Sequence, residues 1–388
     1  MQSKKGLFIV VALILMVPSA SAEESGPMQI RRTAQKAYHD GNWKDAYELY
    51  RQLCLETRTD PEKVGADFTQ AWQCLRQLGR LDELDHLRKE VMERHGDNWR
   101  LLRDVARSYS QNTHWGYMVA GVFCRGDHRG GGKYVNAIQR DRVHALQLMH
   151  RAMNLAEADP AQTEVAQSYL EFARLMLHYR EAQQAWRLQY LTDLTKLPDY
   201  EPGYGHEYDQ RPQGAPVDPE GRPIIHRQSE SWETANSDGQ RWRWLLARAE
   251  ALNPELKTHV SYTLASFWYQ QFGVQTLAAY GGRYRPGRPL EDGQDESGPY
   301  EVHTLTDGET IARLAVGVNR FQLPDEFNYI RHFEKIMNSS DNGYAGPAVR
   351  ALAQIYENRR QYDRALAYGE IYKKHDPPLA RQHIDQIA

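Results

Sequence analysis

The residues that most invite a chemical interpretation lie in one stretch of this chain, 114–133. The stretch ends in Gly130–Lys133, a run of glycines before a lysine, which is the composition of a loop that wraps phosphate groups. That motif also needs a glycine five residues before its last glycine and a serine or threonine after the lysine. Asp127 and Tyr134 occupy those positions. The sequence therefore predicts a turn here and no phosphate site.

Other catalytic and metal-binding templates also fail. The histidines at 114, 128, 144 and 150 lack the spacing of a helical zinc site, and we predict no metal and no cofactor. There is no Gly-x-Ser-x-Gly turn of a serine hydrolase, and the acidic run Glu291–Glu296 lacks the positions of a calcium loop. Carboxylates are abundant, but no pair can be placed across a cleft, so catalytic residues stay unassigned and enzymatic activity stays open.

The same stretch could instead contact a protein partner. Aromatic and arginine side chains are enriched at protein interfaces, and Arg125–Asp127 is the tripeptide of integrin-type adhesion. A salt-bridged or solvated loop is the alternative. The candidate partner-binding residues are His114, Trp115, Arg125, Asp127 and Arg129.

The N-terminus predicts export. Two lysines precede the apolar run Leu7–Val17, which spans roughly 16 Å as a helix and is too short for a hydrocarbon core of about 30 Å. Small residues at Ala20 and Ala22 precede the polar Glu23, the pattern of a signal-peptidase site. Residues 1–22 are therefore a predicted signal peptide, with an uncleaved anchor as the alternative. We expect a periplasmic or secreted protein without stable membrane insertion.

Cysteine content and charge limit the remaining possibilities. Cys54, Cys74 and Cys124 form no Cys-x-x-Cys pair, and we expect buried free thiols. The 48 basic and 51 acidic residues nearly balance, which argues against a nucleic-acid-binding protein that depends on bulk charge. The expected partner is another protein.

Small and aromatic residues recur at helical spacing near both ends of the chain. Each unit places small residues where two antiparallel helices face each other, an aromatic residue beside them, and a turn residue between the helices. Gly41 and Gly79 mark two of these turns. The clearest units cover 30–61 and 346–377, and a third covers 62–96 with Leu84 where alanine is usual.

This spacing resembles the tetratricopeptide repeat. The resemblance implies an all-α fold, an α-solenoid of antiparallel helix pairs with long irregular loop insertions. In the middle of the chain we predict helices at 98–112, 136–157, 161–178, 180–196, 241–253, 257–279, 308–319 and 324–338. The predicted organisation is a signal peptide at 1–22, a helical-repeat region at 23–196, an irregular linker at 197–240, and a second repeat region at 241–388 with a loop at 281–307.

The two longest insertions should lie far apart in this scheme. The segment 113–135 falls within a predicted helix pair, whereas 198–240 falls between two pairs. Because these two kinds of turn lie on opposite edges of a helical solenoid, we expect the insertions to project in opposite directions.

The region of roughly 98–338 also resembles the helical N-terminal portion of planctomycete exported proteins of the alpha-2-macroglobulin type. The motifs that carry this resemblance are His114–Gly116, Arg125–Val135, Arg140–Met149, Ala185–Gln189, Thr192–Leu194, Gly214–Asp218 and Glu309–Ala315. Macroglobulins of this type trap proteases with β-sandwich domains and often a Cys-Gly-Glu-Gln thioester, which this chain lacks. The resemblance implies a stand-alone helical module or one partner of a split protein.

The leading functional hypothesis is an exported, non-catalytic helical-repeat scaffold for protein–protein interaction in the cell envelope. The first alternative is an accessory module of an alpha-2-macroglobulin-type protease-inhibition system. The second is an all-helical carbohydrate-active enzyme, in which the aromatic- and arginine-rich insertions line a sugar groove.

Overall fold

A computed structural model describes residues 26–56, 60–180, 182–203, 214–274, 301–339 and 342–387. These residues are mostly helical, with some antiparallel sheet. The predicted signal peptide, with Ala20, Ala22 and Glu23, lies outside the described residues, as does most of the predicted loop 281–307.

The N-terminal helices form where the repeat pattern predicts them. They are α1 (Gly26–His39), α2 (Trp43–Leu55), α3 (Val64–Leu78) and α4 (Leu84–His95), with a 3-10 turn at Leu81–Glu83 before α4. Ala34, Ala46 and Ala71 are fully buried, so the small residues do let neighbouring helices approach closely. Gly79 ends α3 in the left-handed conformation, with φ of 69°, which glycine adopts at little cost.

The middle of the chain contains α5 (Trp99–Gln111), α6 (Ile138–Ala156), α7 (Gln162–Leu177), α8 (Asp238–Leu252) and α9 (Lys257–Phe272). The side chain of Asn98 caps α5, and that of Ser237 caps α8. The predicted helix at 180–196 is wrong: a short 3-10 helix, Ala182–Gln189, lies there. The helix that packs on α7 is therefore α8, which lies much further along the chain.

The C-terminal part contains α11 (Tyr329–Met337), α12 (Asn342–Asn358), α13 (Tyr362–Tyr372) and α14 (Pro377–Ile387), with 3-10 turns at Val302–Thr304 and Asp325–Phe327. The predicted helix at 308–319 is also wrong. Two antiparallel strands, β5 (Glu309–Leu314) and β6 (Gly317–Gln322), form a hairpin there. Thr310, Ala312 and Leu314 lie on one face of β5 and are all buried, and Ile311 on the other face is buried in a separate small cluster.

A second, four-stranded sheet follows α5. Its strands β1 (Trp115–Val119), β2 (Val122–Arg125), β3 (Lys133–Asn136) and β4 (Glu201–Pro202) are antiparallel in the order β2-β1-β3-β4. Ala120 and Gly121 both have positive φ, 49° and 83°, as the tight turn of a two-residue hairpin requires. The glycine-rich stretch 130–132 leads into β3.

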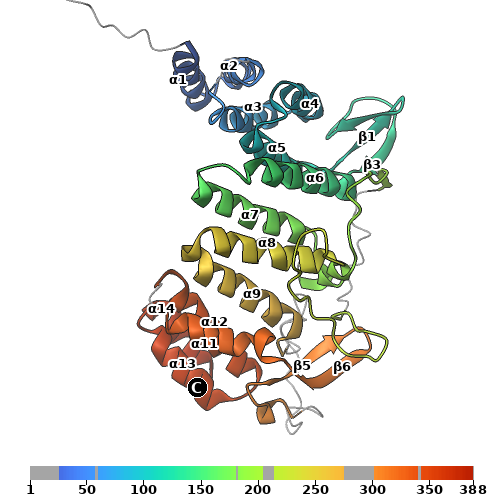
Figure 1. The fold of residues 1–388 in the computed structure, drawn as a ribbon. Coiled ribbons are helices and arrows are strands. Elements are labelled where there is room, and N and C mark those ends of the chain that lie inside the picture. Colours follow the sequence, from blue (N-terminus) through green and yellow to red (C-terminus); the bar gives the residue numbers. More distant parts are fainter. Residues whose placement is uncertain are drawn as a thin grey trace, which may run out of the picture.

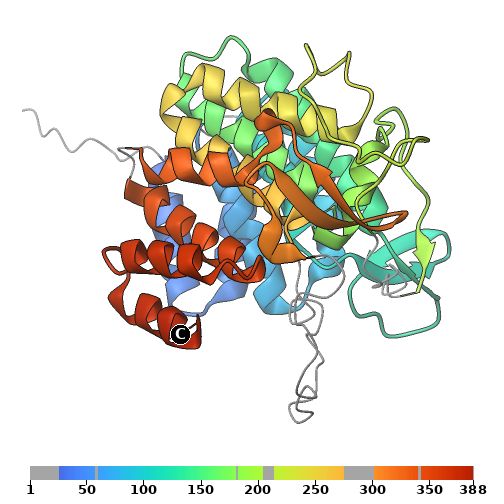
Figure 2. The ribbon, with the colours of Figure 1, turned by 90° about the horizontal axis from the view of Figure 1, so that it is seen from below.

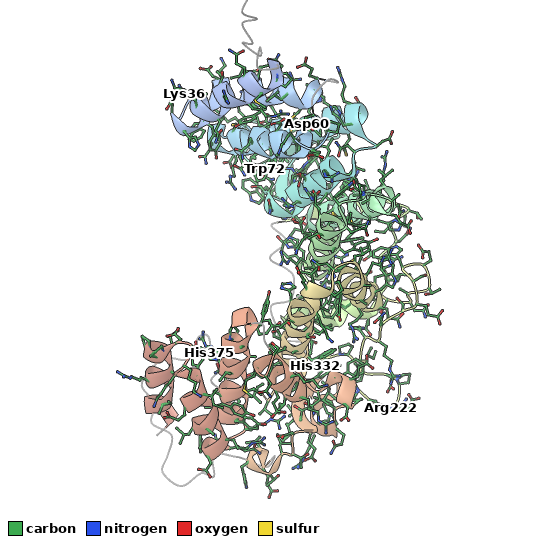
Figure 3. All side chains as sticks on the ribbon, turned by 60° about the vertical axis from the view of Figure 1, so that its left-hand side comes forward. Lys36, Asp60, Trp72, Arg222, His332 and His375 are labelled. Carbon is green, nitrogen blue, oxygen red and sulfur yellow. The ribbon has the colours of Figure 1, made fainter. Side chains whose placement is uncertain are left out.

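The helices follow one another in chain order as a curved stack. Figure 1 shows α5 to α9 as successive layers, with both sheets at one side of the stack. Seen from below, helices occupy one side of the molecule and the inserted strands and loops the other (Figure 2). Figure 3 shows that the stack bends into a C, so that the N-terminal helices and α12 to α14 extend toward the same side.

The two long insertions lie on the same edge, and the prediction that they project in opposite directions is wrong. Strand β4 belongs to the second insertion and pairs with β3 of the first, with Val135 opposite Pro202. The reason is the pairing of α7 with α8. It places 178–237 within a helix hairpin, as 112–137 lies within the α5–α6 hairpin. The segment 273–328 likewise connects α9 to α11, which pack together.

Most of the core is one continuous hydrophobic cluster that runs through the stack. Cys54 and Cys74 are buried free thiols, as predicted, and Cys124 is a partly buried free thiol in β2. Within the described ranges, no helix is both long enough and apolar enough to cross a membrane.

Candidate functional site

A buried network of charges lies where β2 meets the helical stack. Its centre is Arg125, the last residue of β2, which is only 3% exposed. The Arg125 guanidinium donates from Nε to Asp85 Oδ2 at 3.0 Å and from Nη1 to Asp141 Oδ2 at 2.7 Å. Asp85 lies at the start of α4, and Asp141 lies in the first turn of α6. Arg125 therefore fastens the sheet to two helices.

A second arginine extends the network into α5. Arg88 is fully buried and donates to Asp85 at 2.6 Å and to the Ser108 hydroxyl at 2.9 Å. Its guanidinium carbon also lies 3.8 Å from the centre of the Tyr109 ring. Stacking and hydrogen bonds thus replace the water that this cation loses on burial.

His114 completes the network on the side of Asp141. Its Nδ1 lies 2.8 Å from Asp141 Oδ2, and because a carboxylate only accepts, this ring nitrogen is the donor. Burial opposes the negative charge of Asp141, but Arg125 and His114 outweigh that effect and hold the pKa of Asp141 below its ordinary value. Burial likewise opposes the positive charge of Arg125, while Asp85 and Asp141 raise the pKa of Arg125 above its usual range.

A small pocket lies behind this network. It is lined by Tyr109, Ser110, His114, Asp141, Arg142, Ala145, Leu175 and His178. Its volume of about 10 Å³ suffices for about one water molecule. Burial, followed by the charges of His114 and Arg142, lowers the pKa of His178 to about 4, so this imidazole is neutral at pH 7. A His–Asp pair could act as a base, but the pocket beside it has room for about one water molecule. The network is best understood as a structural anchor.

A second buried ion pair holds the return of the 178–237 segment. Arg142 on α6 donates to Asp238 at 3.0 Å, and both side chains are only 2% exposed. Asp238 begins α8 and also accepts a hydrogen bond from the backbone N–H of Thr192 at 2.9 Å. This pair fixes the C-terminal end of the segment to α6 and holds Thr192, within the segment, beside it.

Segments from three consecutive helix hairpins join into one surface. We call this surface the insertion edge and define it as the described residues of 113–136, 178–237 and 301–328. Its first and second segments join through β3 and β4. Its second and third join through Ala215, whose N–H donates to Arg313 O and whose carbonyl accepts from Ala315 N, both at 2.9 Å.

Large apolar side chains are exposed on the insertion edge. Val122 and Val316 are the most exposed of these, at 64% and 62%, and each lies in or beside the turn of a hairpin. A contiguous exposed apolar patch is typical of a protein interaction site, and Val316 and Val318 lie two residues apart at one end of the same hairpin. The full set on the insertion edge is Val122, Tyr179, Tyr190, Leu191, Val316 and Val318.

The five residues predicted to bind a partner divide into two groups. His114 and Arg125 come together on Asp141 and belong to the buried anchor. Trp115 is partly buried in β1, where its ring stacks on Tyr134 with centroids 6.0 Å apart. Asp127 and Arg129 are exposed between β2 and β3.

Sequence reasoning missed the anchor carboxylates Asp85 and Asp141 and the exposed valines. Asp85 and Asp141 lie 40 and 16 residues from Arg125 in the chain, so no local motif connects them. One local indication exists in the sequence, for Val122: it directly follows an Ala-Gly pair, which suits a tight hairpin turn.

No metal site emerges from this geometry. In the part of the chain that the structure describes, no three His, Cys, Asp or Glu side chains gather closely enough to hold a metal ion. A comparison with protein-family models found no match to this chain, and a comparison with curated protein sequences found none either.

Proposed function

We propose that this protein is an exported helical-repeat scaffold, an α-solenoid of tetratricopeptide type, that binds a protein partner through the insertion edge. The observation that carries this proposal is the distribution of exposed apolar side chains. Six of the ten large apolar residues that are exposed in the described chain lie on the insertion edge. Burial of such side chains against a partner provides most of the favourable free energy of association.

The packing of the helices supports the solenoid part of the proposal. Neighbouring helices pack in chain order, from α1 on α2 through α5 on α6 and α7 on α8 to α12 on α13. A stack of this kind leaves one edge free for insertions, and the hairpin turns of successive repeats all face that edge. A binding surface can therefore be assembled there from short segments without a separate domain.

Affinity capture with matched variants tests this function. The mature chain would be crosslinked in its own cell envelope and its partners quantified by mass spectrometry. Val316→Asp places a charge at one of the two most exposed members of the apolar set, in the turn of the β5–β6 hairpin. Leu155→Asp is the matched control, since Leu155 is 41% exposed at the end of α6, outside the insertion edge. We expect one saturable partner with wild type and with the control, and at least about tenfold less with Val316→Asp.

The same experiment separates the alternatives. A captured protein of the alpha-2-macroglobulin type would identify the chain as an accessory module of protease inhibition. Retention on glycan or peptidoglycan without a protein partner would refute the scaffold proposal and favour a carbohydrate-active protein. Equal recovery with both variants would show that the partner binds elsewhere than the insertion edge.

A further inference from the structure

Strand β6 is an edge strand whose outer backbone hydrogen-bonding groups have no partner among the residues that the structure describes. In sheet order, β6 has β5 as its neighbour on one side and no described strand on the other. Leu323 N donates to Gly308 O, and the pairing of Leu314 with Gly317 closes the hairpin. The pairs 308/323 and 314/317 are therefore hydrogen-bonded pairs. Along an antiparallel ladder, hydrogen-bonded pairs alternate with pairs whose backbone groups point outward. The backbone N–H and C=O groups of Val318, Arg320 and Gln322 therefore point away from β5.

The opposite edge of the hairpin shows what such groups do when partners exist. On the β5 side, the outward carbonyls of Glu309 and Arg313 accept from Arg359 and from Ala215 N. Both edges have the same chemistry, but only the β5 edge has outward carbonyls that are bonded within the described chain. The β6 edge is left to water or to another extended chain.

The β6 edge is also accessible. Every residue of β6 except the partly buried Phe321 is exposed, and Val318 is 41% exposed. Natural edge strands are usually protected by prolines, bulges or unpaired charges. Here the one charged residue in the strand, Arg320, is held back by a two-pronged contact with Glu309 at 3.1 and 2.9 Å, although its guanidinium stays partly exposed. That pair lies across the sheet face and leaves the edge open.

We propose that β6 receives an extended segment of the protein partner as a third strand of the β5–β6 sheet. This inference rests on the proposed function and specifies how the partner binds. Unused N–H and C=O groups in alternate register recognise an extended backbone rather than a helix or a small molecule. The exposed Val316 and Val318 add apolar contact beside the same edge, so backbone pairing and side-chain burial act together.

A second copy of this chain fits the edge less well. The antiparallel self-pairing that uses all three outward residues places Arg320 opposite Arg320 of the other copy, and like charges directly opposite are destabilising. A partner segment avoids this repulsion with an acidic residue opposite Arg320. It also gains contact from an apolar residue opposite Phe321, whose ring lies at the edge of the core with its centroid 5.9 Å from that of Phe272.

A proline substitution tests the backbone contact directly. Because the N–H of Val318 points outward, Val318→Pro removes no hydrogen bond of the hairpin, and proline is tolerated at such edge positions. It does remove one donor for an incoming strand. Val318→Thr is the matched control, since threonine has nearly the same shape and keeps the N–H. We expect the affinity for the captured partner to fall about tenfold or more with Val318→Pro relative to Val318→Thr.

The outcomes distinguish the two proposals. If wild type captures no saturable protein, the proposed function fails and the strand-addition inference fails with it. If wild type and Val318→Thr capture the partner and Val318→Pro captures it equally well, the function stands and the β6 inference is overturned. Sedimentation that shows a stable dimer, lost with Val318→Pro, would assign the edge to a second copy and overturn the partner segment.

Hydrogen exchange on the wild-type chain tests the same edge without any variant. In the free protein, the amides of Val318 and Arg320 should exchange fast, while those of Asn319 and Phe321, which pair with β5, should be slower. Crosslinked complex should slow the two fast amides. Equal protection of all four amides in the free protein would mean that the edge is already occupied, and the inference would then be wrong.

Discussion

Replacement of Arg125 by methionine should destabilise the fold strongly, although Arg125 lies in an insertion. Methionine retains much of the apolar stem but removes all hydrogen bonds to Asp85 and Asp141. The Asp141 carboxylate, with its side chain only 2% exposed, then keeps only His114 as a side-chain hydrogen-bond partner. Removal of one partner from a buried ion pair typically costs about 3–5 kcal/mol. Because Asp85 keeps Arg88 and is 34% exposed, we expect a loss near the lower end, about 3 kcal/mol.

Urea unfolding followed by circular dichroism measures this loss, with a double-mutant cycle to isolate its cause. Adding Asp141→Asn to the Arg125→Met variant removes the stranded charge, so the double variant should recover about 1–2 kcal/mol. Arg222→Met is the control, because the Arg222–Asp218 pair is exposed and should contribute less than about 1 kcal/mol. An Arg125→Met loss below about 1 kcal/mol, or strictly additive effects in the cycle, would refute the assignment of Arg125 as the anchor.

The pH dependence of the same variants provides an independent check. The pKa values of Asp85 and Asp141 lie below their ordinary range, held there by Arg125 against the effect of burial. A carboxyl with a depressed folded-state pKa stabilises the fold above its unfolded pKa of about 3.9, and this contribution is lost as pH falls through the folded value. Wild type should therefore lose stability below about pH 4. In Arg125→Met, burial raises the Asp141 pKa instead, so this acid-dependent loss should shrink.

Three further predictions follow from individual side chains. Burial and then the nearby Arg243 lower the pKa of His226 to about 4. The neutral His226 side chain therefore stabilises the fold fully above about pH 6.5, and this contribution is lost as the pH falls toward 4. His226→Gln should lessen the fall in unfolding free energy between pH 7 and 5 by about 1–2 kcal/mol. Cys54 and Cys74 should resist alkylation of the native protein at pH 8, since burial raises both pKa values, and mass spectrometry should find Cys124 labelled first. Gly79→Ala should cost about 1 kcal/mol in urea unfolding because φ of 69° strains an L residue although no atom obstructs the new methyl group.

Much of the helical architecture could be predicted from local patterns. Small residues such as Ala46 and Ala71 mark helix contacts, and the turn at Gly79 and the cap at Asn98 mark helix ends. These signals are local because capping and close approach depend on a few neighbouring residues. Helix pairing is different, since it depends on which faces meet in space. The pairing of α7 with α8, which are separated in the chain by residues 178–237, left no local trace in the sequence.

The β5–β6 hairpin shows a second limit of pattern reasoning. Glu309–Leu314 contains Thr310 and Ile311, which favour strands, but also Ala312, Arg313 and Leu314, which favour helices. Tertiary contact decides between them: the Thr310 hydroxyl bonds to the Phe272 carbonyl at the end of α9. A short segment with mixed propensity takes the structure that its neighbours can bury.

The assembly of the insertion edge explains why its binding residues could not be predicted together. Each segment is short and has little core of its own, so each depends on the stack: Arg125 holds the first, Arg142 with Asp238 the second, and the contact of Thr310 with α9 the third. The spacing between segments is set by helix layers rather than by the chain that connects them. Exposed residues as distant in sequence as Val122 and Val316 thus come to lie on one edge of the stack. A partner that spans the edge would therefore bind more weakly when any layer of the helical stack is disturbed. A partner that binds β6 alone would depend on the hairpin and on its contacts with α9, Ala215 and Arg359. Comparing partner affinity of Arg125→Met with that of Val318→Pro distinguishes these two modes, because only the first variant releases the β1–β4 sheet while leaving β6 intact.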